Sequence, residues 1–285
     1  VPAIQIGETA FLAMHSEAEH LEADHDAVES HDLENSLGGI QSSNASFTPI
    51  SASIGAVWDF TEGYNLGLSY VHAQRAPSSS EIYSFGPHIG TSTYELGAFY
   101  DITDDGDVIF QAQDLAVEKS NNIDISLRKF SGEFVLNAFY NQVNDYYFAA
   151  DSGFVVEGEH DETDELVDIM AEEHGDELPV FLFTAVDVDL YGFEAQVNWQ
   201  ATASLQLQAQ GDLVRTKLDE NMGESQYLPR TPTSRLGVSA NYVLGDWQAE
   251  LSLHKYFTQD RVAEFESETK GYTLVDLDIN YLTSF

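Results

Sequence analysis

The sequence predicts an all-β protein, an antiparallel transmembrane β-barrel with long extracellular loops, and three observations lead to this prediction. Many segments alternate polar and apolar residues with a period of two, as strands with one apolar face do. Their connections alternate between very short turns and long polar excursions, which is typical of outer-membrane barrels. Acidic residues gather in the excursions and leave the strands nearly uncharged, as a lipid-facing surface requires.

The alternation is clearest over 51–60, where Ala52, Ile54, Ala56, Trp58 and Phe60 share one side. It indicates about ten strands. In chain order they are 4–14, 51–60, 64–75, 121–129, 134–148, 186–199, 205–216, 234–243, 247–257 and 272–281. The alternation is weaker at 4–14, 121–129, 205–216, 234–243 and 272–281.

The connections separate this fold from a soluble one. Short turns are expected near 61–63, 130–133, 201–203 and 245–246, and long excursions at 15–44, 76–120, 151–180, 217–231 and 258–271. Several structureless loops of that length count against a compact soluble domain. The five excursions hold 35 of the 49 Asp and Glu residues. A soluble β-sandwich with solvated acidic loops is the alternative.

Composition excludes several classes of protein. The 285 residues carry 11 Lys and Arg against 49 Asp and Glu, a formal net charge of −38, so we expect no nucleic-acid partner, because phosphate recognition needs clustered bases. A hydrophobic fraction of 43% with 12% aromatic residues argues against disorder. No apolar run approaches the roughly 18 residues of a transmembrane helix. The absence of cysteine excludes disulfides and thiolate metal sites.

Histidines recur among carboxylates in the predicted loops and suggest metal capture. His15, His20, His25 and His31 lie five or six residues apart in the first excursion, amid eight acids. His160 and His174 lie among the twelve acids of 151–180, and His88 lies in the excursion between these two. Imidazole and carboxylate bind Zn²⁺ without thiolate, so we predict these seven histidines as metal ligands. A solvated acidic surface is the alternative interpretation.

The sequence offers no catalytic motif, so we expect no enzyme and no required cofactor. Carboxylate pairs are too common in so acidic a chain to single out an acid and a base, and no nucleophile elbow or phosphate-binding loop is present. Because Lys and Arg are so few in this chain, we expect each of them to pair with an acidic residue. We expect Arg75 and Arg230, at strand ends, to pair with lumen carboxylates such as Asp212 or Glu194.

Several ordered motifs carry a resemblance to a known family. Residues 75–84 (RAPSSSEIYS), followed by 86–88 and 93–97, resemble the barrel of TonB-dependent outer-membrane receptors, particularly the zinc-uptake branch. Residues 120–124 (SNNID) are similar to the start of that family's next strand, and 227–232 (YLPRTP) with Arg235 to its entry into a later strand. Residues 139–141 (FYN) with 145–147 (DYY) also match that family's pattern of an aromatic strand that leads into a loop.

The resemblance implies a receptor of the Gram-negative outer membrane that imports a scarce metal, with the lipid bilayer and the TonB energy-coupling complex as partners. We therefore expect residues 1–285 to be about ten strands of a 22-stranded barrel, without the family's plug domain and last hairpin. Zinc is the expected transported ligand.

Three other functions stay open at this point. The first is a heme or ferric-siderophore receptor of the same fold. The second is a closed ten-stranded barrel of the adhesin or protease-like kind. The third is a soluble, acidic, Ca²⁺-binding β-domain.

Overall fold

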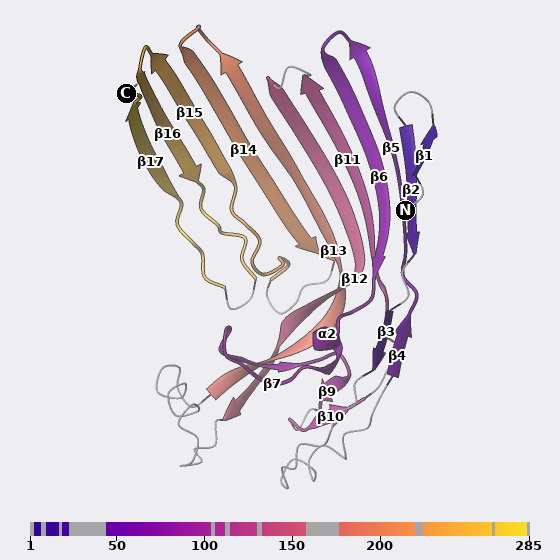
Figure 1. Ribbon diagram of the computed structural model, residues 1–285. Helices are drawn as coiled ribbons and strands as arrows, with labels where there is room; N and C mark the ends of the chain where they lie inside the picture. Colours follow the sequence, from indigo (N-terminus) through magenta and orange to yellow (C-terminus); the bar gives the residue numbers. More distant parts are fainter. Residues whose placement is uncertain are drawn as a thin grey trace.

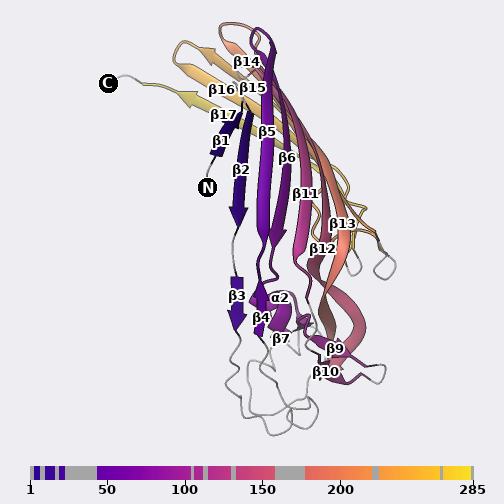
Figure 2. The same cartoon turned by 90° about the vertical axis from the view of Figure 1, so that its right-hand side faces the viewer.

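The computed structural model describes residues 3–6, 10–16, 19–22, 44–103, 106–111, 115–129, 133–157, 177–219, 225–263 and 266–283. Most of them form one curved antiparallel sheet whose neighbouring strands follow chain order (Figures 1 and 2). Its strands are β1 (Ala3–Ile6), β2 (Ala10–Ser16), β5 (Ile50–Thr61), β6 (Tyr64–Arg75), β11 (Glu118–Lys129), β12 (Phe134–Glu157), β13 (Glu177–Gln200), β14 (Leu205–Leu218), β15 (Arg235–Leu244), β16 (Trp247–Tyr256) and β17 (Tyr272–Tyr281).

Nine of the ten predicted strands are confirmed, from β5 to β17, and the first is corrected. The sequence predicts one strand over 4–14, whereas β1 and β2 form an antiparallel pair with Ile4 opposite Leu12. Among the described residues, β1 pairs only with β2 and β17 only with β16, on opposite edges of the sheet (Figure 1). The sheet is therefore open, which contradicts a closed ten-stranded barrel.

The strands turn their apolar faces outward. Ile54, Tyr70, Ile123, Tyr140 and Tyr191 lie opposite one another in a continuous row across five strands. Each of them is between 41% and 49% exposed. A soluble β-sandwich would bury such a row, so the structure contradicts that alternative. The exposed apolar face is the lipid-facing surface of a barrel wall.

Aromatic residues mark the end of this apolar surface at the short turns. Trp58, Trp199 and Trp247 are each at least 56% exposed, and Trp247 packs on Tyr281 with ring centroids 4.8 Å apart. Trp and Tyr favour the membrane–water interface, because one end of the ring is apolar and the other polar. The turn between β5 and β6 is tight, and Gly63 supplies its positive φ of 79°.

A conventional buried core lies at the opposite end of the sheet, outside the apolar band. The excursion predicted at 76–120 is in fact structured. It contains α2 (Ser79–Tyr83), β7 (Phe85–His88), β8 (Thr93–Leu96), β9 (Tyr100–Ile102) and β10 (Val108–Phe110). We call the described residues of 76–117 the loop-end module. Figures 1 and 2 show it below the barrel strands. Ile82, Leu96 and Phe99 are at most 3% exposed and form its core.

Strands β12 and β13 extend far beyond the apolar band. The predicted excursion 151–180 therefore starts later than expected, since β12 continues to Glu157 and pairs with Glu177 of β13. A bulge between Val143 and Tyr146, with Asp145 at a φ of 57°, re-aims the strand at the level where the module begins. A second hairpin at this end pairs β3 (Glu19–Glu22) with β4 (Asn44–Phe47).

The described helices include none that is long and apolar enough to cross a membrane.

Candidate ligand site at the loop end of the sheet

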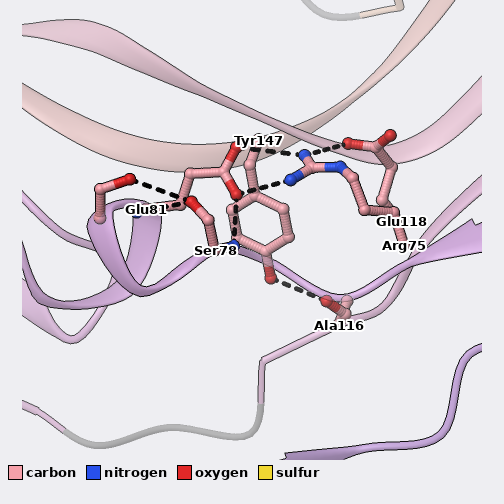
Figure 3. Close-up of polar contacts among 7 residues, drawn as sticks. Arg75, Ser78, Glu81, Ala116, Glu118 and Tyr147 are labelled. Carbon is pink, nitrogen blue, oxygen red and sulfur yellow. Dashed lines mark hydrogen bonds and ion pairs between the residues drawn. The ribbon is translucent and has the colours of Figure 1, made fainter. Parts of the chain in front are cut away.

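Arg75 anchors the loop-end module to the barrel wall. It is the last residue of β6, and its guanidinium donates to Glu81 of α2 at 2.7 and 3.1 Å and to Glu118 of β11 at 2.6 Å (Figure 3). Ser78 caps α2, because its hydroxyl accepts from the Glu81 amide while its own amide donates to the Glu81 carboxylate. Glu81 thus holds the helix start and the barrel strand together.

The charges of this cluster reinforce one another. Partial burial opposes the charge on Arg75, but hydrogen bonds and attraction from Glu81 and Glu118 outweigh it and raise the pKa of Arg75. Burial acts to raise the pKa of Glu81, but the hydrogen bonds from Arg75 and the Ser78 amide outweigh it and bring that pKa below its ordinary value of 4.5. Tyr147 adds a hydrogen bond of 2.9 Å from its hydroxyl to the Ala116 carbonyl (Figure 3).

Replacing Arg75 by alanine should lower the stability of the loop-end module by about 1–2 kcal/mol. The side chain is 43% exposed, so solvent screening reduces the effect of leaving Glu81 and Glu118 unpaired. Because the pKa of Glu81 is lowered by folding, its contribution is present above the ordinary carboxyl pKa and is lost as pH falls through the lowered value. Limited proteolysis within 76–117 measures this. Arg75→Ala combined with Glu81→Gln should recover part of the loss.

Residues 97–99 close against the end of α2. The amides of Gly97, Ala98 and Phe99 donate to the carbonyls of Ser84, Glu81 and Ile82 at 2.7, 2.8 and 3.2 Å. These bonds satisfy helix carbonyls that lack an intrahelical partner. They also fix the hairpin of β7 and β8, which joins the barrel sheet through a parallel pairing of Tyr94, Glu95 and Leu96 with residues 180–182 of β13.

An open pocket of about 660 Å³ lies between the loop-end module, the extensions of β12 and β13, and the loops after β14 and β16. That volume lies within the range of small-molecule sites. Tyr146, Phe148, Phe181, Phe183 and Tyr227 form its aromatic walls. Its charged lining consists of Glu95, Asp151, Glu266 and Arg230.

Two loops form one side of the pocket and are joined by Glu266. Its carboxylate accepts from the amides of Arg230 at 2.7 Å and Ala263 at 3.0 Å, so it spans the loops after β14 and β16. Arg230 has a positive φ of 59°. Glu266 thus has a structural role in the pocket wall, and Glu95 and Asp151 are the other two acidic residues of the lining.

His88 lies beside the pocket at the end of β7. Its Nδ1 is 2.8 Å from the Thr91 hydroxyl and 3.8 Å from Glu95 Oε1. The Thr91 and Thr93 hydroxyls are 2.6 Å apart, and Thr93 reaches Glu95 at 3.5 Å. This chain links an exposed imidazole to a carboxylate in the pocket wall, and imidazole and carboxylate are the side-chain types that bind zinc in the absence of thiolate.

The other predicted metal ligands fall in different places. His15 belongs to β2, opposite Ser51, and His20 to β3, opposite Ser46, so neither lies in the loop where the sequence places it. His25, His31, His160 and His174 lie outside the described residues. Within the part of the chain that is described, no three His, Asp or Glu side chains are grouped to hold a metal ion.

The predicted arginine pairs are also corrected. Arg75 binds Glu81 of the loop-end module and Glu118 of β11, and the Arg230 backbone binds Glu266. Asp212 pairs instead with Arg235, its neighbour across β14 and β15. The expectation fails because an arginine at a strand end meets the folded loops first, whereas register brings Arg235 to Asp212.

Sequence reasoning missed the aromatic walls of the pocket. Tyr146 and Phe148, and Phe181 and Phe183, are pairs two residues apart just beyond the lipid-facing part of each strand. Such spacing places both rings on one face of a strand. Aromatic pairs at the loop end of adjacent long strands are therefore the signal that could have indicated this site.

Solved structures of other proteins share this fold. The chain is similar to the copper transporter OprC, with 16% identity and a TM-score of 0.67, over 99% of this chain and 38% of that one. It is also similar to the FrpB iron transporter from Neisseria meningitidis (F3-3 variant), with 14% identity and a TM-score of 0.55, over 98% of this chain and 37% of that one. The ferric-catecholate import receptor Fiu from K12 E. coli is similar with 13% identity and a TM-score of 0.58, over 99% of this chain and 37% of that one.

The chain thus spans under two fifths of the length of these three proteins, and at such identities the similarity shows the fold. A family assignment comes from the sequence itself. Residues 23–284 match the family described as "TonB dependent receptor-like, beta-barrel". The chain therefore belongs to the β-barrel family of the TonB-dependent receptors of the Gram-negative outer membrane.

Proposed function

We propose that the chain is part of the barrel wall of an outer-membrane receptor that imports a scarce metal, with zinc as the transported ion. The observation that carries this proposal is the acidic pocket with an imidazole at its edge: Glu95 and Asp151 face the pocket, and His88 is linked to Glu95. Carboxylate and imidazole together suit zinc better than a purely oxygen site does. By family, energy would come from the TonB complex.

The remaining histidines support capture before entry. Glu157 lies opposite Glu177 at the last described pair of β12 and β13. In the sequence, His160 lies three residues after Glu157 and His174 three residues before Glu177. We propose that they, with His15, His20, His25 and His31, exchange metal ahead of the pocket, where the acidic excursions raise the local cation concentration.

A zinc titration of the full-length receptor tests this function. Replacing His15, His20, His25 and His31 together by alanine should weaken zinc binding at least about tenfold, which corresponds to about 1.4 kcal/mol. Binding should also weaken between roughly pH 7 and 5.5, because imidazole must be neutral to bind metal. The strand variant His72→Ala with His254→Ala is the control and should bind as the wild type does. If none of the three proteins binds zinc, zinc capture is rejected. If all three bind zinc equally, the role of these four histidines is rejected.

A ferric chelate or heme is the second candidate, and the aromatic walls favour it. Phe181, Phe183 and Phe148 with a single guanidinium, Arg230, suit a flat anionic ligand. Quenching of the intrinsic tryptophan fluorescence of the full-length receptor by added ligand distinguishes the two functions. Hemin or a ferric catecholate should then bind the wild type and the four-histidine variant equally, and should bind Phe181→Ala more weakly. That result replaces zinc as the cargo.

A further inference from the structure

The histidine at the edge of the pocket is connected to a carboxylate in the pocket wall through two hydroxyl groups. The turn after β7 brings the hydroxyls together, because the Thr91 amide donates to the His88 carbonyl at 3.3 Å and Ser92 has a positive φ of 54°. A positive φ is uncommon for a residue other than glycine, and such residues concentrate at functional sites. Thr91, Thr93 and Glu95 line the pocket, and Thr93 is only 8% exposed. The hairpin backbone therefore holds these groups in place.

The chemistry of these four groups restricts the direction of their hydrogen bonds. Among the described residues, the Glu95 carboxylate has two partners, the Thr93 hydroxyl at 3.5 Å and His88 Nδ1 at 3.8 Å. A carboxylate only accepts, so Thr93 donates to it and in turn accepts from the Thr91 hydroxyl at 2.6 Å. Thr91 has no second proton, so its oxygen accepts from His88 Nδ1 at 2.8 Å. In this arrangement His88 carries its proton on Nδ1, and Nε2 keeps its lone pair.

Two other arrangements of the same protons are possible. If Thr91 donates to the His88 carbonyl at 3.4 Å instead, its oxygen still accepts from His88 Nδ1, so the tautomer is unchanged. If Thr91 donates to His88 Nδ1, the Thr93 proton must turn to Thr91. The Glu95 carboxylate then loses its donor, and the Nδ1 lone pair faces that anion at 3.8 Å. Both arrangements with the proton on Nδ1 turn an N–H or O–H toward the anion, whereas the third does not.

We propose that Thr91 and Thr93 are positioning residues that hold His88 as a zinc ligand through Nε2. Metal-binding histidines donate their second ring N–H to a carboxylate, a carbonyl or a water, which fixes the tautomer and the ring orientation. Here two hydroxyls relay that donation to Glu95, so Nε2 is deprotonated before any metal arrives. The His88 side chain is 55% exposed, so zinc can reach the ring. The choice of zinc rests on the proposed function, whereas the tautomer does not.

Histidine-selective ¹⁵N NMR of the full-length receptor without metal tests the tautomer at about pH 8, where imidazole is neutral. The variant His88→Ala identifies the two ring signals. In the wild type the proton should be on Nδ1. Thr91→Val and Thr93→Val should each move it toward Nε2, because the relay to Glu95 is cut, whereas Thr91→Ser and Thr93→Ser keep the hydroxyls and should keep the wild-type tautomer. A proton on Nε2 in the wild type, or an unchanged tautomer in both valine variants, overturns the proposal.

Zinc added to the same samples tests the ligand atom. Zinc should shift the His88 Nε2 signal and leave the Nδ1 proton in place, and half-saturation of that signal in Thr93→Val should need at least about tenfold more zinc. Thr93→Ser should bind as the wild type does. A merely structural role of Thr93 predicts the reverse order, because serine removes a buried methyl group and valine keeps the volume.

Two results of the zinc titration overturn the proposal. One is equal half-saturation of the His88 signal in the wild type and Thr93→Val. The other is a His88 signal that zinc leaves unchanged. Zinc binding by the rest of the receptor then decides the proposed function separately, because the other predicted ligands do not depend on the two threonines.

Discussion

Replacing Gly97 by alanine is expected to destabilise the loop-end module by about 3 kcal/mol or more. A Cβ atom at this position would lie 2.2 Å from the Ile82 carbonyl oxygen and 2.6 Å from the Tyr83 amide nitrogen. Both neighbours are backbone atoms, so no side-chain rotation relieves the contact. Either α2 or residues 97–99 must move, and the bonds from Ala98 and Phe99 to the helix carbonyls are lost.

Hydrogen exchange in the full-length receptor measures this effect, because it reports the Ala98 and Phe99 amides directly. Gly90→Ala is the matched control. Its added Cβ would lie 3.3 Å from a carbon of the exposed His88 ring, which can move, so the change should stay within about 0.5 kcal/mol. Equal amide protection in the two variants would show that residues 97–99 do not hold the module closed. A loosened module should also weaken ligand binding, because Thr93 and Glu95 line the pocket.

Sequence reasoning succeeds for the barrel strands because their determinants are local. The period-two alternation of 51–60 or 247–257 follows from lipid on one face and a polar interior on the other. The same signal ends where the membrane ends, which explains the error at His15. There β2 continues to Ser16 through backbone pairing with β5, and beyond the apolar band that pairing needs no apolar face.

The loop-end module and its pocket depend on contacts between distant segments. Tyr94 of β8 pairs with Val180 of β13, and Glu266 binds the Arg230 amide across two loops. Neither contact leaves a periodic pattern in either segment. The motif around Arg75 does indicate the place, because the capping box of Ser78 and Glu81 can be recognised in the sequence. The Glu118 partner and the aromatic walls emerge only from the folded arrangement.

Replacing Leu251 by arginine should destabilise the receptor in a bilayer by about 2–4 kcal/mol, the cost of a charge on the lipid face near the bilayer midplane. Leu251 is 44% exposed on the outward face of β16. It lies opposite Ala240 of β15 and Leu277 of β17 in the apolar band. Trp247 and Lys255 are each four residues away, roughly 13 Å along the strand, so the guanidinium has the longest path to either interface.

Leu244→Arg makes the same chemical change at a different depth. Leu244 is 60% exposed, also faces outward, and lies opposite Trp247 at the short turn, where a charge on the lipid face costs only about 0–1 kcal/mol. Denaturant unfolding of the full-length receptor in phospholipid vesicles compares the two variants. If a membrane covers the exposed rows of the sheet, the loss of unfolding free energy is much larger for Leu251→Arg than for Leu244→Arg. Equal costs would mean that this face meets water or another protein surface.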